Sequence, residues 1–291
     1  MITIVGNGAI GNLLALQCHK LGFEYQIMTR GAPLEKITVE GKICADICKL
    51  NIVKPHSKIE SGLLILPLKA YQIVPCIEQL KDQISKNVSV IMLHNGMGTH
   101  LQAKALIPNH NIAVATTSYG AFKPETHRLN VTGLGQTQAG WLVKHSVNTL
   151  HQSWFSQLLP PCTWYNDIEP MLWHKLAINA IINPLTTLYD IPNGELTKSK
   201  YLPQIKQLAS EIASVMGALK IDADAQQLVN NCLSVAKVTA KNYSSMHQDI
   251  HHERPTEIDF INGYIVQLAK SVGVAVHLNQ QLLQKIKKME N

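Results

Sequence analysis

Hydrophobic residues in the first half of the chain occur in short runs separated by segments with helical periodicity. The runs predict strands at Ile2–Val5, Tyr25–Met28, Leu63–Leu66, Val88–Leu93 and Ile112–Thr117. Strands that alternate with helices in this way are typical of βαβ units, which stack into a mainly parallel sheet. Between Arg128 and Trp141 the pattern changes to short Thr- and Gly-rich segments, which predict antiparallel strands finishing that sheet.

From about Asp167 onward the strand pattern disappears and long stretches with apolar periodicity follow. They predict helices at Met171–Thr187, Leu202–Leu219, Ala225–Ser244 and Thr256–Val272. The sequence therefore predicts an α/β N-terminal domain over residues 1–166 and an all-α C-terminal domain over residues 167–291. Because no linker rich in Pro, Gly or Ser separates them, we expect the two domains to pack directly against each other with a cleft between them.

Composition narrows the class of protein. With 46% hydrophobic and 16% charged residues, the 291-residue chain has the balance of a folded globular protein rather than a disordered one. No apolar run approaches the roughly 18 residues that a membrane span needs, and the opening residues do not form a secretory signal. We therefore expect a soluble cytoplasmic protein without membrane partners, and we expect its six cysteines to be free thiols.

The net charge of +6 comes from 26 basic and 20 acidic residues that are dispersed along the chain. Nucleic-acid-binding domains gather such charge on one face or along one stripe. We therefore expect no nucleic-acid partner.

A glycine-rich motif follows the first predicted strand. Gly6-Asn7-Gly8-Ala9-Ile10-Gly11 is a GxGxxG that leads directly into a segment with helical periodicity. In dinucleotide-binding sites the first glycine allows a tight turn, the second lets a pyrophosphate approach the backbone, and the third lets helix and strand pack closely. The order of strand, motif and helix favours a Rossmann-type cofactor site over a tight turn without a ligand.

The end of the second strand bears on cofactor choice. A carboxylate about 20 residues beyond the glycine motif binds the ribose hydroxyls of NAD, whereas a basic residue there accommodates the 2′-phosphate of NADP. This chain has no carboxylate at that strand end and has Arg30 close by. The pattern favours NADPH, although Arg30 alone is also compatible with an ordinary solvated loop residue.

Three polar residues interrupt the most apolar helix of the second half. Lys175, Asn179 and Asn183 are spaced i, i+4, i+8, so they share one helix face. A half-buried lysine has a lowered pKa and is a better proton donor near neutrality, and the two carboxamides would hold a small polar substrate beside it. The alternative interpretation is the solvent face of an amphipathic helix.

Several other segments have similar polar character. His94–Gly98 follows a strand at the sheet edge where α/β proteins bind ligands. Asn193 lies in a Pro-Asn-Gly-Glu turn and Glu257 lies in a predicted first helical turn, and both are compatible with purely structural roles. His247 and His251 have a spacing compatible with zinc, but no catalytic motif frames them, so we expect no metal.

Taken together, these motifs resemble those of the ketopantoate reductases (2-dehydropantoate 2-reductases), which make pantoate for pantothenate and coenzyme A synthesis. The resemblance extends over nearly the whole chain. The stretches that carry it are Gly6–Gly11, Leu68–Ala70, His94–Thr99, Leu172–Asn179, Ile182–Thr186, Pro192–Leu196, Ser244–Asp249 and Thr256–Gly263.

The resemblance implies NADPH-dependent reduction of ketopantoate to (R)-pantoate, with cofactor and substrate meeting in the interdomain cleft. Lys175 is implied as the proton donor to the ketone oxygen. The implied substrate residues are Asn179, Asn183, Asn193 and Ser245. The implied cofactor residues are Gly6, Asn7, Gly8, Ala9, Ile10, Gly11, Arg30, Lys69, Asn95, Ala121 and Glu257. Glu211 is a weaker candidate for tuning the site.

Two other functions remain open from the sequence. An NADPH-dependent reductase of another branched 2-oxo acid would carry the same motifs, because the fold alone does not fix the side-chain pocket. A non-catalytic NADPH-binding sensor would keep the glycine motif but would need neither Lys175 nor the asparagines. Either a monomer or a homodimer is compatible with the sequence.

Overall fold

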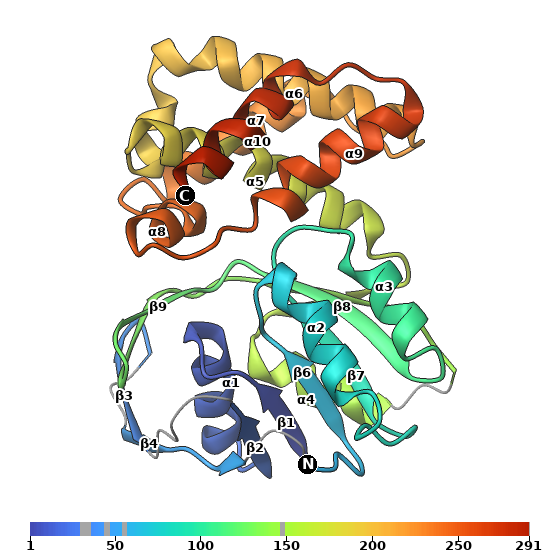
Figure 1. Cartoon of the computed structure of the whole chain (residues 1–291). Coiled ribbons are helices and arrows are strands. Elements are labelled where there is room, and N and C mark those ends of the chain that lie inside the picture. Colours follow the sequence, from blue (N-terminus) through green and yellow to red (C-terminus); the bar gives the residue numbers. More distant parts are fainter. Residues whose placement is uncertain (30–35, 44–46, 54–56, 146–148, 291) are drawn as a thin grey trace. The chain divides into compact units, whose positions relative to one another are not determined.

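The computed structural model describes residues 1–29, 36–43, 47–53, 57–145 and 149–290. The chain divides into two compact units (Figure 1). The first comprises Met1–His94 and Thr99–Ile168, and the second comprises Asn95–Gly98 and Glu169–Asn291. Each unit has its own hydrophobic core. The short segment Asn95–Gly98 thus follows a strand of the first unit in the chain but packs with the second.

The first unit is built on an eight-stranded sheet. Its strands, in spatial order, are β12 (Cys162–Tyr165), β11 (Thr137–Val143), β8 (Asn111–Thr117), β7 (Ser89–Leu93), β6 (Leu63–Leu66), β1 (Ile2–Val5), β2 (Tyr25–Met28) and β5 (Ile52–Val53). All neighbouring pairs are parallel except β8 and β11. The five strands predicted from apolar runs are confirmed to within one residue.

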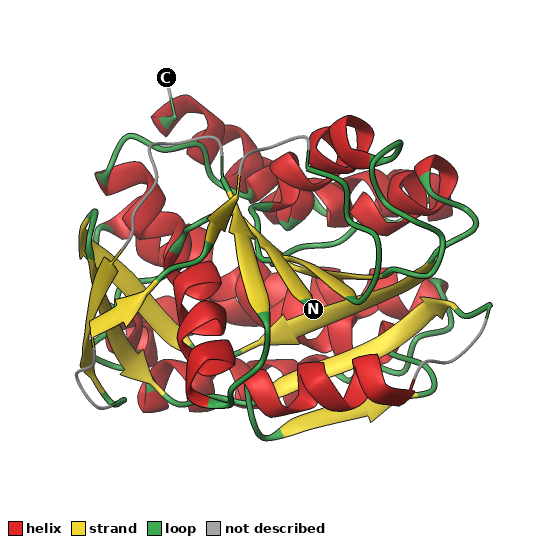
Figure 2. Cartoon of the chain, turned by 90° about the horizontal axis from the view of Figure 1, so that it is seen from below, coloured by secondary structure: helices red, strands yellow, loops and turns green. Residues whose placement is uncertain are grey.

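Helices connect these strands, as the yellow strands and red helices of Figure 2 show. They are α1 (Ala9–Lys20), α2 (Ala70–Leu80), α3 (Thr99–Leu106) and α4 (Thr149–Leu158). β1 pairs with β2 on one side and with β6 on the other, so the chain reverses its direction of growth across the sheet between β1 and β6. Open α/β sheets bind ligands at the carboxyl ends of strands at such a switch point.

A second, four-stranded sheet has the order β4 (Ile47–Lys49), β3 (Lys36–Gly41), β10 (Arg128–Gly133) and β9 (Gly120–Glu125). The prediction that the segments after Arg128 finish the main sheet is right for β11 and wrong for β10. The physical reason lies in α1, whose consecutive residues Leu13, Leu14, Ala15 and Leu16 are all fully buried and therefore need cover on more than one face. The second sheet supplies that cover, because Leu129 and Val131 of β10 join the same core as α1.

The second unit is all helical over the residues that the structure describes, which confirms the predicted fold class. Its elements are α5 (Glu169–Tyr189), η1 (Asn193–Thr197), η2 (Ser199–Tyr201), α6 (Leu202–Ala218), α7 (Ala225–Val238), α8 (Ser245–His251), η3 (Ile258–Phe260), α9 (Asn262–Val272) and α10 (His277–Met289). Within the described ranges, no helix has both the length and the apolar character needed to cross a membrane. Cys162 and Cys232 are free thiols, as expected.

Two helix extents differ from the prediction. The helix predicted to run to Ser244 ends at Val238, and Ser244 instead caps α8 by accepting a hydrogen bond from His247 N at 3.2 Å. The helix predicted to begin at Thr256 begins at Asn262. The segment before it contains only the short 3-10 helix η3, and Phe260 O at its end accepts a hydrogen bond from Met97 N at 2.9 Å.

Candidate active site

The glycine motif forms the turn from β1 into α1, and its three glycines have different surroundings. Gly6 has a φ of +92°, which favours glycine. A Cβ on Gly11 would stand 2.3 Å from Gly6 O, so only glycine fits there. A Cβ on Gly8, by contrast, would have no atom within 4 Å. The outer glycines are therefore required by the turn itself, whereas Gly8 presents open backbone at the N-terminus of α1.

Lys69 lies at the carboxyl end of the neighbouring strand β6, where it is the N-cap residue of α2. Its backbone N–H donates to Gln72 Oε1 at 3.2 Å. Leu68, one residue earlier, contacts the glycine turn, since its Cδ2 would lie 3.0 Å from a Cβ on Gly6. The structure thus brings Lys69 and the glycine motif to the same edge of the sheet.

Lys123 is a neighbour of the glycine motif that the sequence analysis missed. Its Nζ donates to Asn7 O at 3.2 Å, and Asn12 Nδ2 donates to the same oxygen at 3.1 Å. Burial lowers the pKa of Lys123. The sequence position of Ala121 could have pointed to Lys123. Residues two apart on a strand share a face, so if Ala121 faces the cofactor, Lys123 faces it too. Arg30, the residue on which the cofactor preference was based, lies outside the described residues.

In the second unit, Lys175 is half-buried on α5. Burial lowers its pKa to about 8, and the negative charge of Glu257 opposes that fall. Glu257 is only 4% exposed and is the N-cap residue of η3. A lysine with a pKa near 8 gives up a proton more readily than an ordinary lysine, yet it is still mostly protonated at neutral pH.

Asn95 joins this pair through Glu257. Its Nδ2 donates to Glu257 Oε2 at 3.3 Å. The next residue, Gly96, has a φ of +82°, and a Cβ there would stand 2.6 Å from Phe260 O. This close approach holds the 95–98 segment against η3, so Asn95, Lys175 and Glu257 belong to one unit although they are far apart in the sequence.

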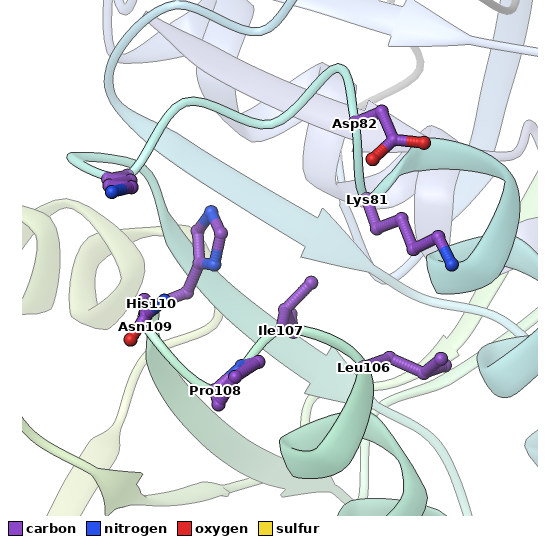
Figure 3. Close-up of a pocket in the computed structure, with 8 residues that line it drawn as sticks. Lys81, Asp82, Leu106, Ile107, Pro108, Asn109 and His110 are labelled. Atoms are coloured by element: carbon purple, nitrogen blue, oxygen red, sulfur yellow. The ribbon is translucent and has the colours of Figure 1, made fainter.

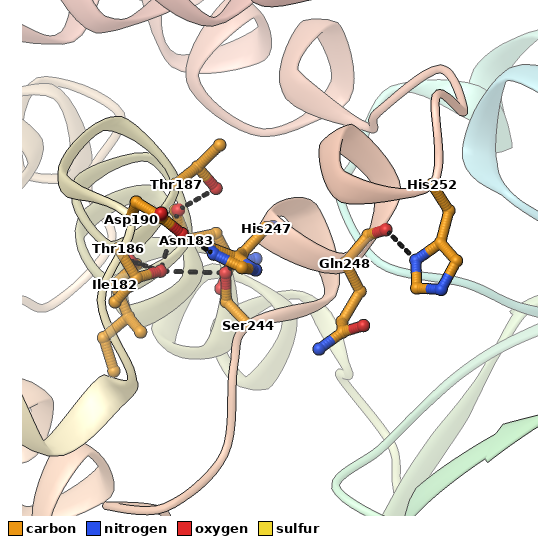
Figure 4. A network of polar contacts seen from close by, with 9 residues as sticks. All are labelled: Ile182, Asn183, Thr186, Thr187, Asp190, Ser244, His247, Gln248 and His252. Atoms are coloured by element: carbon orange, nitrogen blue, oxygen red, sulfur yellow. Dashed lines mark hydrogen bonds and ion pairs between the residues drawn. The ribbon is translucent and has the colours of Figure 1, made fainter. Parts of the chain in front are cut away.

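Lys175, Asn179 and Asn183 form a polar stripe along one face of α5, the α5 stripe, and its two asparagines do not face solvent. Asn183 is 6% exposed and Asn179 is half-buried, which argues against the amphipathic-helix alternative. Around Asn183 the polar groups form a network (Figure 4). Thr187 Oγ1 donates to Asn183 O at 2.7 Å, and Thr186 Oγ1 lies 2.8 Å from Ser244 Oγ, which links this end of α5 to the start of α8.

Asn193 and Ser245 lie at the ends of short helices in the same unit. Asn193 is 7% exposed, and its Nδ2 donates to Thr239 Oγ1 at 2.9 Å. Its Oδ1 is buried without a hydrogen-bond partner among the described residues. Ser245 is exposed as the first residue of α8, whereas its neighbour Ser244 is buried and caps the helix.

Other candidates have structural partners. The Glu211 carboxylate accepts hydrogen bonds from Leu278 N at 2.9 Å and from Asn279 N at 3.0 Å, at the start of α10. His247 Nε2 lies 2.7 Å from Asp190 Oδ1 (Figure 4) and, because a carboxylate only accepts, donates to it. Across the part of the chain that is described, no three His, Cys, Asp or Glu side chains are grouped to hold a metal ion.

A shallow pocket lies elsewhere in the first unit, between the end of α2 and residues 106–110 that lead from α3 into β8 (Figure 3). None of the predicted site residues lines it. The candidate active-site residues of the first unit are therefore the glycine turn, Lys69 and Lys123. Those of the second unit are Lys175 with Asn95, Glu257 and the asparagines of α5.

Comparison with known proteins identifies the family. Residues 2–143 match the family model described as ketopantoate reductase PanE/ApbA, and residues 167–290 match the model of its C-terminal part. The chain belongs to the ketopantoate reductase family.

Among curated relatives, the 2-dehydropantoate 2-reductase of Vibrio cholerae serotype O1 is 34% identical, covering 99% of this chain and 97% of the relative. That of Escherichia coli O157:H7 is 32% identical, covering 100% and 95%.

Solved structures of two kinds share the fold. The ternary complex of D-mandelate dehydrogenase with NADH and anilino(oxo)acetate has a TM-score of 0.91 at 25% identity, covering 100% of this chain and 98% of that one. A ketopantoate reductase from Ralstonia eutropha JMP134 has a TM-score of 0.87 at 20% identity, covering 100% and 98%.

Proposed function

We propose that this protein reduces 2-dehydropantoate (ketopantoate) to (R)-pantoate with NADPH, as a step of pantothenate and coenzyme A biosynthesis. The observation that carries the proposal is the lowered pKa of Lys175, which lies near 8. This lysine is on the apolar helix α5, in the same unit as Glu257, Asn179 and Asn183. A non-catalytic sensor has no use for such a proton donor. The names of the full-length curated relatives support the choice of ketopantoate.

The glycine turn fits a dinucleotide. Gly8 leaves open space at the N-terminus of α1, and the first turn of α1 carries no acidic residue that would repel a pyrophosphate. We assign the backbone of Gly6–Gly11 to the pyrophosphate, with Lys69, Asn95, Ala121 and Glu257 as further cofactor residues and Arg30 at the 2′-phosphate. Lys123 joins this set because its ammonium group lies against the turn at Asn7.

NADPH, when bound, supplies the hydride that the ketone carbon accepts. The chain's own contribution is made by Lys175, whose Nζ donates a proton to the ketone oxygen as negative charge develops there, leaving neutral lysine and the product hydroxyl. Glu257 keeps Lys175 protonated, because its negative charge raises the pKa that burial lowers. With a pKa near 8, about nine-tenths of the Lys175 side chains carry the proton at pH 7.

We assign Asn179, Asn183, Asn193 and Ser245 to the substrate. Carboxamides and a hydroxyl match the carboxylate and hydroxyl groups of a small polar 2-oxo acid.

One observation favours a second candidate, reduction of another branched or aromatic 2-oxo acid with NADH. The D-mandelate dehydrogenase complex, which shares this fold at a TM-score of 0.91, contains NADH. Both candidates use the same proton donor and differ in the side-chain pocket and in the site of the 2′-phosphate.

An assay of cofactor oxidation by the purified protein separates these functions. It uses NADPH and NADH with a panel of 2-oxo acids, including ketopantoate and phenylglyoxylate, the oxo acid that corresponds to mandelate. The proposal expects the highest kcat/KM with ketopantoate and NADPH, and tighter NADPH than NADH binding that Arg30→Ala abolishes. Turnover of phenylglyoxylate with NADH alone selects the second candidate, and NADPH binding without any turnover selects a sensor.

We also propose a cellular location and an assembly state for the enzyme. The pathway assigned here is cytoplasmic, and the enzyme works as a monomer or a homodimer. Light scattering coupled to size-exclusion chromatography distinguishes the two states directly, by a mass of one or two 32.2 kDa chains.

A further inference from the structure

The helix that carries Lys175 contains a proline in its interior. Pro184 lies within α5, five residues before the helix ends at Tyr189. Proline has no N–H, and its ring crowds the carbonyl group four residues earlier, which in α5 belongs to Ala180. Ala180 O therefore lacks the helical hydrogen bond that the N–H of residue 184 would otherwise donate.

Asn262 supplies the missing donor. This residue is the first of α9 and is fully buried, and its Nδ2 donates to Ala180 O at 3.0 Å. A side-chain amide from another helix thus stands in for the N–H that Pro184 lacks. Buried backbone carbonyls need such a partner, because a buried acceptor without a hydrogen bond keeps the full cost of its desolvation.

The orientation of the Asn262 amide is fixed by a chain of hydrogen bonds. Glu211 can only accept, so the Nδ2 of the buried Asn279 faces it, at 2.8 Å from Glu211 Oε2. Asn279 Oδ1 therefore faces the other way and accepts from Asn262 Nδ2 at 3.0 Å. Both N–H groups of Asn262 are thereby directed at acceptors, and its own Oδ1 is left buried without a partner among the described residues. In this orientation the Asn262 amide leaves its own oxygen without a partner in the described part of the chain and directs one N–H at Ala180 O of α5.

The position of this contact matters for the active-site stripe. Lys175 and Asn179 precede the turn of α5 between Ala180 and Pro184, in which the proline removes one helical hydrogen bond, and Asn183 lies within that turn. Helices bend at interior prolines, so the geometry held at Ala180 decides how Asn183 is aimed relative to Lys175.

We propose that Asn262 is a positioning residue for the reduction: it holds the turn of α5 before Pro184 in one geometry and thereby aligns Asn183 with Lys175 and Asn179. Asn279 and Glu211 orient its amide. The proposal rests on the proposed function for the roles of Lys175, Asn179 and Asn183. It also gives Glu211 a specific part, as the charged end of the chain that orients Asn262.

The test is a double-mutant cycle between Asn262→Ala and Pro184→Ala. Alanine in place of the proline restores a helical N–H for Ala180 O, which makes the Asn262 amide redundant. We expect Asn262→Ala to lower kcat with ketopantoate about tenfold in the wild-type background, because small misalignments of reacting groups are costly. In the Pro184→Ala background the same change should lower kcat less than twofold. NADPH affinity, read by fluorescence titration, should stay within twofold throughout.

Asn279→Ala is the matched control for stability. It also removes buried hydrogen bonds, to Asn262 and to Glu211, but leaves the contact from Asn262 to Ala180 O in place. We expect it to lower the melting temperature about as much as Asn262→Ala, whereas kcat should fall by no more than about threefold, because Asn262 loses the partner that orients its amide but keeps Ala180 O as an acceptor. Equal kcat losses in the two variants would show general loosening of the core and would overturn the proposal.

The remaining outcomes are also decisive. Equal effects of Asn262→Ala in the wild-type and the Pro184→Ala backgrounds would contradict the proposal. If Asn262→Ala alone does not fold, the double variant with Pro184→Ala must fold, and its failure would count against the assigned contact. If the wild-type protein does not reduce ketopantoate, the proposed function fails, and the cycle is measured with whichever 2-oxo acid the protein does reduce.

Discussion

Glu257 raises the pKa of Lys175 while burial lowers it, and burial has the larger effect, so the pKa lies at about 8. Glu257 is itself buried and accepts a hydrogen bond from Asn95. The proposed proton donor, Lys175, and the charge that raises its pKa therefore lie in one helical unit, together with Asn179 and Asn183. This relationship decides both the pH dependence of the reaction and the effect of removing either residue.

The rate of reduction should fall as pH rises through about 8, because Lys175 must carry a proton to act as the acid. Glu257→Gln removes the charge that raises this pKa, so the fall should shift to lower pH. The profile of kcat/KM for ketopantoate between pH 6 and 10 measures both effects. NADPH affinity over the same range is the control. A profile that is flat through pH 9 would exclude Lys175 as the acid.

Removing Lys175 should also affect stability. The sequence alone predicts that Lys175→Ala folds at least as well as the wild type, since truncation removes the cost of burying a cation. The buried carboxylate of Glu257 reverses that expectation, because it loses the charge that balances it. We expect Lys175→Ala to lose about 1–3 kcal/mol of unfolding free energy, and Lys175→Ala/Glu257→Gln to regain most of it without regaining activity. Urea denaturation at pH 7 reports this difference, and equal stability of the two variants would contradict it.

Gly8 and Gly11 should respond in opposite ways to a methyl group. Gly8→Ala meets open space and an ordinary φ of −66°, so the melting temperature should stay near the wild-type value while the NADPH dissociation constant rises at least about tenfold. Gly11→Ala places Cβ against Gly6 O and should cost about 3 kcal/mol or more. Thermal melts and cofactor titrations of the two variants form a matched pair. Unchanged NADPH binding by Gly8→Ala would remove the glycine turn from the cofactor site.

Lys123→Met tests the cofactor residue that the structure added. Loss of a charged hydrogen-bond donor next to the glycine turn should raise the NADPH dissociation constant about tenfold, a difference of about 1.4 kcal/mol. The salt dependence of binding should also weaken, since one positive charge near the phosphates is gone. Lys42→Met, which removes the same charge from an exposed side chain next to the smaller sheet, is the control. Identical titrations for both variants would argue that Lys123 only supports the turn.

Local patterns predicted the fold well where an element's character depends on its own residues. The runs Ile2–Val5 and Leu63–Leu66 are strands in the structure. On α5, Asn183 is buried and Lys175 and Asn179 are half-buried, as a candidate site requires. The pairing of strands that are far apart in the sequence was harder to predict. Nothing in Arg128–Gly133 by itself says that it pairs with Lys36–Gly41 to cover α1 rather than joining the main sheet.

The same limit applies to the site. Lys175, Asn179 and Asn183 share a helix face, so spacing alone brings them together. The approach of Asn95 to Glu257, 162 residues apart, depends on Gly96 packing against Phe260 and has no local signature. Lys123 was missed because its significance comes from the carbonyl of Asn7, which another element presents. Contacts of this kind become visible only once the chain is folded.

The most direct test of the account is the steady-state rate of NADPH oxidation with ketopantoate by the wild-type protein and by Lys175→Ala, measured alongside the NADPH affinity of both. The account predicts ready turnover by the wild type, a kcat lower by about 10²–10⁴-fold in the variant, and NADPH dissociation constants within twofold of each other. Near-normal turnover by a folded Lys175→Ala variant would contradict it, because the proton would then come from a group other than Lys175.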